Sequence, residues 1–142
     1  MANPVRKLKF DNINMGEQAP IVSHKLTRTD LVRYAGASGD FNPMHSDEVA
    51  AKAAGLPSVF GHGMFSMGLL GRAITDWAGP GNLLNYRVRF TKQTWPGETL
   101  SSRIVVTGKE ETKEGKVITA EISLVNQDGE AKLSGSTKVL AA

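Results

Sequence analysis

The sequence predicts a single α+β domain over residues 1–142, built from one long apolar helix and an antiparallel sheet. The first observation is the stretch from Gly61 to Ala78, where apolar residues recur every three to four positions, as on one face of a helix. The second is the change to a period of two from residue 85 onward, where four segments have the pattern of strands. The third is the length of 142 residues, which suits one domain with its own core. One apolar helix beside one sheet favours a helix wrapped by the sheet.

The first third of the chain predicts short elements. Residues 1–20 are expected to be irregular and residues 21–26 to form a short strand. Thr27 and Asp30 have the spacing of a capping box and open a helix near residue 28, which Gly36 and Gly39 are expected to end. Ser46 is expected to cap a second short helix that runs to residue 54.

The remaining elements are the long helix and the sheet. The helix is expected to end near Ala78, before the Gly-Pro-Gly of residues 79–81. Its predicted buried face consists of Met64, Met67, Leu70, Ile74 and Trp77. Strands are expected at residues 85–90, 99–108, 117–126 and 131–140, with turns at 95–98, 113–116 and 127–130. Short turns between successive strands predict that the four form a meander.

Composition excludes several classes of protein. The chain has no cysteine, so a disulfide framework and a thiolate metal site are excluded. Its three histidines lack the spacing of a zinc site, so we expect no metal and no cofactor. The net charge of +3 comes from scattered Lys and Arg residues without a dense basic face, which argues against nucleic-acid binding. Mild basicity does favour an anionic partner, such as a nucleotide-bearing thioester or an acidic carrier protein.

The sequence also predicts a cytoplasmic protein without a membrane segment. Residues 1–7 lack the apolar core of a signal peptide. The chain has no apolar run that approaches the roughly 20 residues needed to span a bilayer.

The stretch from Gly36 to His45 carries the chemistry. Its Ser-Gly and Asn-Pro pairs predict a loop, and Pro43 should hold Asn42 extended. A stiff loop can point Asp40 and His45, five positions apart, into one space, where both could hold one water. That arrangement suits the addition or removal of water by general acid–base catalysis. The alternative interpretation is that Asp40 simply braces a turn.

Residues 34–45, which end in the Asp-x-Asn-Pro-x-His motif, resemble the MaoC-like dehydratases when taken with the later Gly-His-Gly-Met of residues 61–64. This family includes (R)-specific enoyl-CoA hydratases and the catalytic subunits of bacterial (3R)-hydroxyacyl-carrier dehydratases. The resemblance spans roughly residues 10–140. It implies the hot-dog fold, in which an antiparallel sheet wraps a long central helix. It also implies reversible hydration between trans-2-enoyl and (3R)-3-hydroxyacyl thioesters of CoA or acyl carrier protein.

The resemblance assigns roles to five residues. Asp40 and His45 match the catalytic pair of the family, and Asn42 and Pro43 match the residues that shape its loop. Gly63 matches the glycine whose backbone amide faces the thioester carbonyl, at a helix N-terminus that stabilises negative charge.

Other residues near the second motif are candidates for the substrate pocket. They are His62, Met64, Phe65 and Ser66. His62 could instead be a structural histidine bonded to nearby backbone, and the methionines could belong to the core. Some family members have a serine nine positions after the histidine of the second motif, where this chain has Gly71. Ser66 could replace that serine or simply pack within the helix.

Two other functions stay open at this point. A hot-dog thioesterase would bind the same substrate and hydrolyse it, and a non-catalytic hot-dog subunit would pair with an active one. The intact Asp-x-Asn-Pro-x-His motif argues against both. A single sheet around one helix leaves its edge strands unpaired, so a dimer is expected. We expect a homodimer, with a heterodimer of related hot-dog subunits as the alternative.

Overall fold

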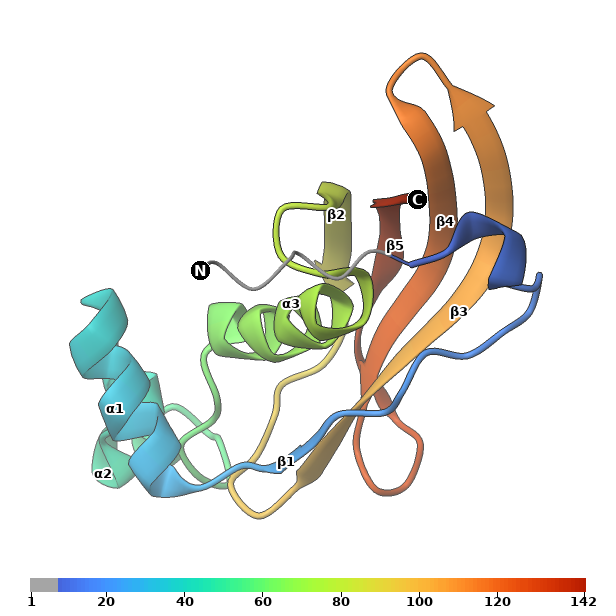
Figure 1. Cartoon of the computed structure of the whole chain (residues 1–142). Helices are drawn as coiled ribbons and strands as arrows, with labels where there is room; N and C mark the ends of the chain where they lie inside the picture. Colours follow the sequence, from blue (N-terminus) through green and yellow to red (C-terminus); the bar gives the residue numbers. More distant parts are fainter. Residues whose placement is uncertain (1–7) are drawn as a thin grey trace.

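The computed structural model describes residues 8–142 and shows a curved sheet with one long helix, α3 (Gly63–Ala78), packed against its concave face (Figure 1). Within these residues the sheet has five strands, all antiparallel. Their order across the sheet is β1 (Ser23–Lys25), β3 (Thr99–Thr112), β4 (Gly115–Val125), β5 (Ala131–Ala141) and β2 (Leu83–Phe90). The predicted α+β class and the hot-dog arrangement are confirmed.

The core lies between α3 and the sheet. Leu70 and Ile74 of α3 are fully buried, and they face apolar side chains from the central strands. These strand residues are Ile104, Val106, Ile118, Leu124 and Leu133. The predicted buried face is therefore correct at its centre, but Met64 at the start of the helix is 57% exposed. An apolar residue at helical spacing is not always buried, so periodicity alone placed Met64 on the wrong side.

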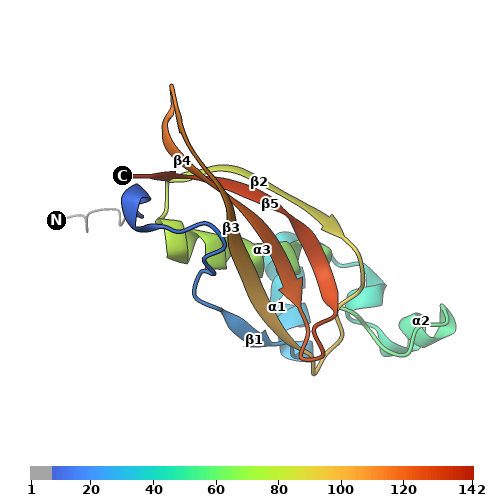
Figure 2. The same cartoon turned by 90° about the vertical axis from the view of Figure 1, so that its right-hand side faces the viewer.

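The predicted four-stranded meander is wrong in one place. Successive strands pair from β3 to β5, but β2 pairs with β5 and lies at the opposite edge of the sheet from β1. Figure 2 shows β2 beside β5. Residues 91–98 carry the chain from this edge back to β3. They are tied to three separate segments, through the backbone bonds Thr91 N–H to Lys132 O, Gly61 N–H to Thr94 O and Gly97 N–H to Leu26 O.

The N-terminal elements differ in detail from their prediction. Residues 1–7 of the segment expected to be irregular lie outside the described residues, and Phe10–Asn12 forms a 3₁₀ helix (η1). Helix α1 (Arg28–Ser38) has the predicted capping box of Thr27 and Asp30. It does not end at Gly36, because only Gly39 adopts the left-handed conformation, with φ of 77°.

Helix α2 (Glu48–Ala53) is capped by Asp47, not by Ser46. The Asp47 side chain accepts hydrogen bonds from the backbone of Val49 and Ala50, at 3.0 and 3.1 Å. Ser46 belongs to the preceding 3₁₀ turn, where its N–H donates to Pro43 O. Helices α1 and α2 lie together at one end of α3 (Figure 1). Among residues 8–142, every helix is too short or too polar to cross a bilayer.

A buried ionic network fixes the crossing segment of residues 91–98 to the sheet. Lys132 on β5 is 1% exposed, and its ammonium lies 3.0 Å from Glu98 and 2.7 Å from Glu130. Burial by itself would lower the pKa of Lys132, but the hydrogen bonds to Glu130 and Glu98 outweigh it and raise the pKa. Glu98 also accepts bonds from the Trp95 backbone and the Asn126 side chain. The network therefore links the crossing segment with β5 and with the turn before it.

We expect Lys132→Met to lower the free energy of unfolding by about 3–5 kcal/mol, because it leaves the buried carboxylate of Glu98 without its counter-charge. Urea denaturation of the two proteins measures this change. Lys138→Met is the control, since Lys138 is half exposed where it pairs with Glu110. An exposed pair contributes at most about 1 kcal/mol. Equal losses in the two variants would contradict a stabilising role for the buried network.

Candidate active site

The end of helix α1 positions Asp40. Gly39 turns the chain, and Ser38 Oγ accepts a hydrogen bond from Asp40 N–H at 3.1 Å. The Asp40 carboxylate then accepts a bond from Asn42 N–H through Oδ1, at 3.2 Å. This closes a local turn of the kind that Asp favours. One carboxylate oxygen thus holds the loop, and Oδ2 points toward His45.

A short 3₁₀ helix, η2 (Pro43–His45), positions His45. Asn42 caps it by accepting a bond from Met44 N–H at 3.1 Å, and Pro43 occupies its first position. Asn42 itself has φ −56° and ψ 125°, as expected for a residue before proline. The predicted loop is therefore helical at both ends and irregular between. The two residues expected to shape it, Asn42 and Pro43, fix its turn.

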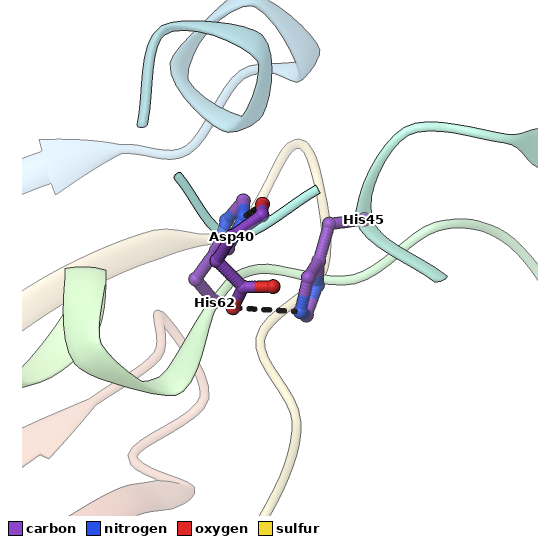
Figure 3. A group of neighbouring side chains, drawn as sticks. All are labelled: Asp40, His45 and His62. Carbon is purple, nitrogen blue, oxygen red and sulfur yellow. Dashed lines mark hydrogen bonds and ion pairs between the residues drawn. The ribbon is translucent and has the colours of Figure 1, made fainter. Parts of the chain in front are cut away.

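The ring of His45 is buried and oriented by backbone. Its Nδ1 lies 2.7 Å from Phe60 O, and because a carbonyl can only accept, Nδ1 carries the hydrogen. In the neutral ring Nε2 is then the basic nitrogen. Nε2 lies 3.9 Å from Asp40 Oδ2 (Figure 3), which is beyond direct hydrogen-bond length. Asp40 is half exposed, whereas His45 is 8% exposed, so one of the two groups faces solvent.

His62 completes the cluster and is 1% exposed. Its ring stacks on that of His45 with centroids 3.9 Å apart, and its Nε2 donates to Asp40 O at 3.1 Å. Burial lowers the pKa of His62, and the nearby His45 lowers it further. His62 is therefore a neutral ring that supports both the backbone of Asp40 and the face of His45. Figure 3 shows the three side chains converging from the loop and from the start of α3.

The same three residues are where a metal could bind. Asp40, His45 and His62 each offer one ligand atom, and these atoms all lie within 4.8 Å of one another. Tetrahedral zinc places its ligand atoms about 3.4 Å apart. Asp40 is half exposed, and one nitrogen of each histidine is already bonded to a backbone carbonyl. The expected absence of a metal stays a prediction.

Gly63 is the first residue of α3, next to a cavity of about 270 Å³. A helix begins with N–H groups that have no partner within the helix, and the Gly63 N–H has no backbone acceptor among residues 8–142. A Cβ at this position would lie 3.1 Å from the Phe90 ring. The cavity is lined by Phe60, Gly61, Gly63 and Ser66, by residues 90–94 and by Leu133. Asp40 and His45 do not line it, but Phe60 does, and its carbonyl is the one that holds His45.

The other predicted pocket residues are divided. Ser66 is 1% exposed and lines the cavity. Met64 points outward, and Phe65 packs edge-on against the rings of Tyr34 and His24. Neither of the latter two lines the cavity.

At Gly71, the ring of Tyr86 occupies the space beside the helix. A Cβ there would lie 3.3 Å from that ring. The Tyr86 hydroxyl donates to Met67 O at 2.6 Å, and burial raises its pKa. In this chain the Tyr86 ring of β2 packs against Gly71, which is the position where some family members carry a serine.

Sequence reasoning missed Phe60 and Thr94. Phe60 acts through its backbone carbonyl, which carries no signal of residue type. Thr94 lies in the crossing segment, and only the fold brings it beside Gly61.

Comparisons with known proteins agree with this architecture. Residues 12–127 match the family model described as "MaoC like domain". The chain is 43% identical over 82 residues to the 3-hydroxyacyl-thioester dehydratase Y of Mycobacterium tuberculosis, covering 55% of this chain but only 28% of that protein. It is 30% identical over 101 residues to the (R)-specific enoyl-CoA hydratase of Rhodospirillum rubrum, covering 70% of this chain and 69% of the hydratase.

The solved structure of the R-hydratase PhaJ1 from Pseudomonas aeruginosa superposes with a TM-score of 0.85 at 27% identity. The superposition covers 96% of this chain and 87% of the hydratase. A family match over most of the chain and a similar structure along nearly all of it lead to the same assignment. The chain belongs to the MaoC-like domain family.

Proposed function

We propose that this protein catalyses the reversible hydration of trans-2-enoyl thioesters to (3R)-3-hydroxyacyl thioesters. The observation that carries the proposal is the basic Nε2 of His45 facing the Asp40 carboxylate at 3.9 Å, near the N-terminus of α3. The relatives named as (R)-specific hydratase and 3-hydroxyacyl-thioester dehydratase support it.

The spacing of Asp40 and His45 suits a shared water. Polar atoms that lie beyond hydrogen-bond length are commonly bridged by a water molecule. In hydration, one of the two groups takes a proton from this water as its oxygen attacks C3, and a proton is returned to C2. The roles exchange in dehydration. His62 keeps the His45 ring in place through the reaction, because it stacks on the ring and holds the Asp40 backbone.

The N-terminus of α3 suits the thioester carbonyl. When hydroxide adds to C3, negative charge develops on the carbonyl oxygen as an enolate. A backbone N–H at a helix N-terminus is a preorganised donor for that oxygen. Gly63 provides this N–H without a side chain in the way.

Mixing the purified protein with trans-2-butenoyl-CoA tests the reaction. We expect loss of the absorbance of the conjugated enoyl thioester without release of a free thiol, and the same rate in the presence of EDTA. Release of thiol would indicate a thioesterase instead. A wild-type protein that changes neither signal, with enoyl-CoA or with enoyl-carrier-protein substrates, would contradict the proposal. Comparing the two carriers over several chain lengths identifies the preferred substrate.

We further propose that the single domain works as a homodimer. Among residues 8–142, β2 pairs only with β5, so its other edge is free, and Leu84 and Phe90 on this strand are exposed. Pairing of two such edges would satisfy the backbone and cover apolar surface. A heterodimer with a related hot-dog subunit is the alternative. A cytoplasmic location stays a prediction.

Light scattering of the pure chain is expected to give twice the mass of one chain at micromolar concentration, because an exposed strand edge is a template for pairing. The activity measured in the same samples should follow the dimer on dilution. A monomeric mass with full activity would contradict the dimer. Inactivity that a second hot-dog subunit restores would identify the heterodimer.

A further inference from the structure

Two hydroxyl groups in the wall of the cavity are buried without a hydrogen-bond partner among residues 8–142. Ser66 is 1% exposed and Thr94 is 3% exposed, and both line the cavity. Ser66 Oγ and Thr94 Oγ1 have no partner in the described part of the chain. A buried hydroxyl without a partner destabilises a fold, and Ala or Val would fill nearly the same space without this penalty. Two such groups in one cavity point to a ligand that binds both.

A backbone hydrogen bond at the cavity holds the Thr94 hydroxyl close to Gly61. Gly61 N–H donates to Thr94 O at 2.8 Å. A Cβ at Gly61 would collide with Thr94 Oγ1, so only glycine leaves room for the hydroxyl at this place. Ser66 lies one turn along α3 from Gly63, a rise of about 4.5 Å. The two hydroxyls thus line the same cavity as Gly63, whose backbone N–H we propose as the donor to the thioester carbonyl.

The rest of the cavity wall indicates the chemical class of the ligand. Phe60, Phe90 and Leu133 provide apolar surface. Lys92 is exposed, and its ammonium binds Glu130 at 2.7 Å. The lining therefore offers no buried charge to a carboxylate or a phosphate. A hydroxyl can both donate and accept, so the matching group is a neutral oxygen of a hydroxyl, ketone or amide.

We propose that Ser66 and Thr94 form a subsite that binds a neutral oxygen of the thioester substrate, with an oxygen-bearing acyl chain as its source. This inference rests on the proposed function and deepens it. Ser66 and Leu133 are buried, whereas Thr91, Lys92 and Gln93 are exposed. Because the bulky carrier stays outside the protein, the acyl chain is the part of the substrate that reaches the buried end. An amide of the pantetheine arm is the other source of the same chemistry.

Binding of unreactive, saturated thioesters tests the subsite separately from catalysis. The ligands are octanoyl-CoA, its counterparts with one hydroxyl at each carbon from C4 to C7, and octanoyl-N-acetylcysteamine, which lacks the outer amide of the arm. We expect the wild type to bind at least one hydroxylated ligand about tenfold more tightly than octanoyl-CoA by calorimetry. Ser66→Ala and Thr94→Val should each remove most of this preference. Each variant loses one hydrogen bond, and one hydrogen bond contributes about a tenfold difference in affinity.

Two matched variants control for the loss of a buried hydroxyl. Ser102 Oγ accepts a bond from Val22 N–H at 2.9 Å, and Thr137 Oγ1 donates to Asn85 O at 2.8 Å. Ser102→Ala and Thr137→Val should lower the thermal midpoint and leave the binding preference unchanged. Ser66→Ala and Thr94→Val should keep or raise the midpoint, because their hydroxyls have no partner in residues 8–142 to lose.

The outcomes separate the possible sources. If both variants weaken octanoyl-CoA but not octanoyl-N-acetylcysteamine, the bound oxygen is the outer amide of the pantetheine arm. If both variants weaken the two ligands alike, the bound oxygen is one that both ligands share, such as the inner amide. The subsite stands in either case. Dissociation constants within twofold of the wild type for every ligand would overturn it. Failure of the wild type to hydrate any enoyl thioester would count against the proposed function, whereas unchanged binding counts against the subsite alone.

Discussion

Asp40→Asn and His45→Gln are each expected to lower kcat for enoyl-thioester hydration by about 10²–10⁴, the usual contribution of a positioned general acid or base. His45 Nε2 and Asp40 Oδ2 face each other at 3.9 Å, and His62 is the third titratable group of this cluster. Asn at position 40 can still accept the bond from Asn42 N–H that holds the loop. The loss should therefore appear in kcat while circular dichroism stays unchanged.

Two control variants make the same chemical changes elsewhere. Asp47→Asn removes a carboxylate seven residues away, and Asn caps a helix as well as Asp does. His24→Gln removes a histidine that pairs with Asp30 and packs edge-on against Phe65. Both should hydrate at nearly the wild-type rate. A folded Asp40→Asn or His45→Gln protein with the kcat of the controls would remove that residue from the mechanism.

Gly63→Pro is expected to lower kcat by about 10²–10³, the effect of removing one donor to a developing oxyanion. Proline deletes the backbone N–H and is tolerated at the first position of a helix. His62 already has φ −60° and ψ 133°, which suits a residue before proline. The fold should therefore survive the change, and steady-state kinetics measures the loss.

Gly63→Ala is the matched control, because it keeps the N–H. It adds the same Cβ, which would lie 3.1 Å from the Phe90 ring and requires a small shift of that ring. We expect Gly63→Ala to retain far more activity than Gly63→Pro. If the two variants lose equal activity, contact with Phe90 explains the loss and the carbonyl is held elsewhere. A fully active proline variant would lead to the same conclusion about the carbonyl.

The sequence by itself determined the features that depend on neighbouring residues. The capping box of Thr27 and Asp30 and the long helix α3 follow from spacings of three to four residues, and both are present. The turns between β3 and β4 and between β4 and β5 follow from glycine-containing pairs, and both are present. Asp40 and His45 are five residues apart in a loop fixed by Asn42 and Pro43, so their approach is also a local consequence of the sequence. These interactions form within one or two turns of chain, where residue type restricts the backbone directly.

Only the tertiary structure decided what lies around that loop. The position of β2 beside β5 depends on a pairing between residues some fifty positions apart, such as Tyr86 with Thr137, and alternation identifies a strand without identifying its neighbour. The crossing segment that results places Thr94 beside Gly61. The carbonyl of Phe60 orients His45 across fifteen residues, and any residue type could provide that carbonyl. Contacts of this kind depend on how the helix and the sheet pack together, and a single sequence does not encode them in any short pattern.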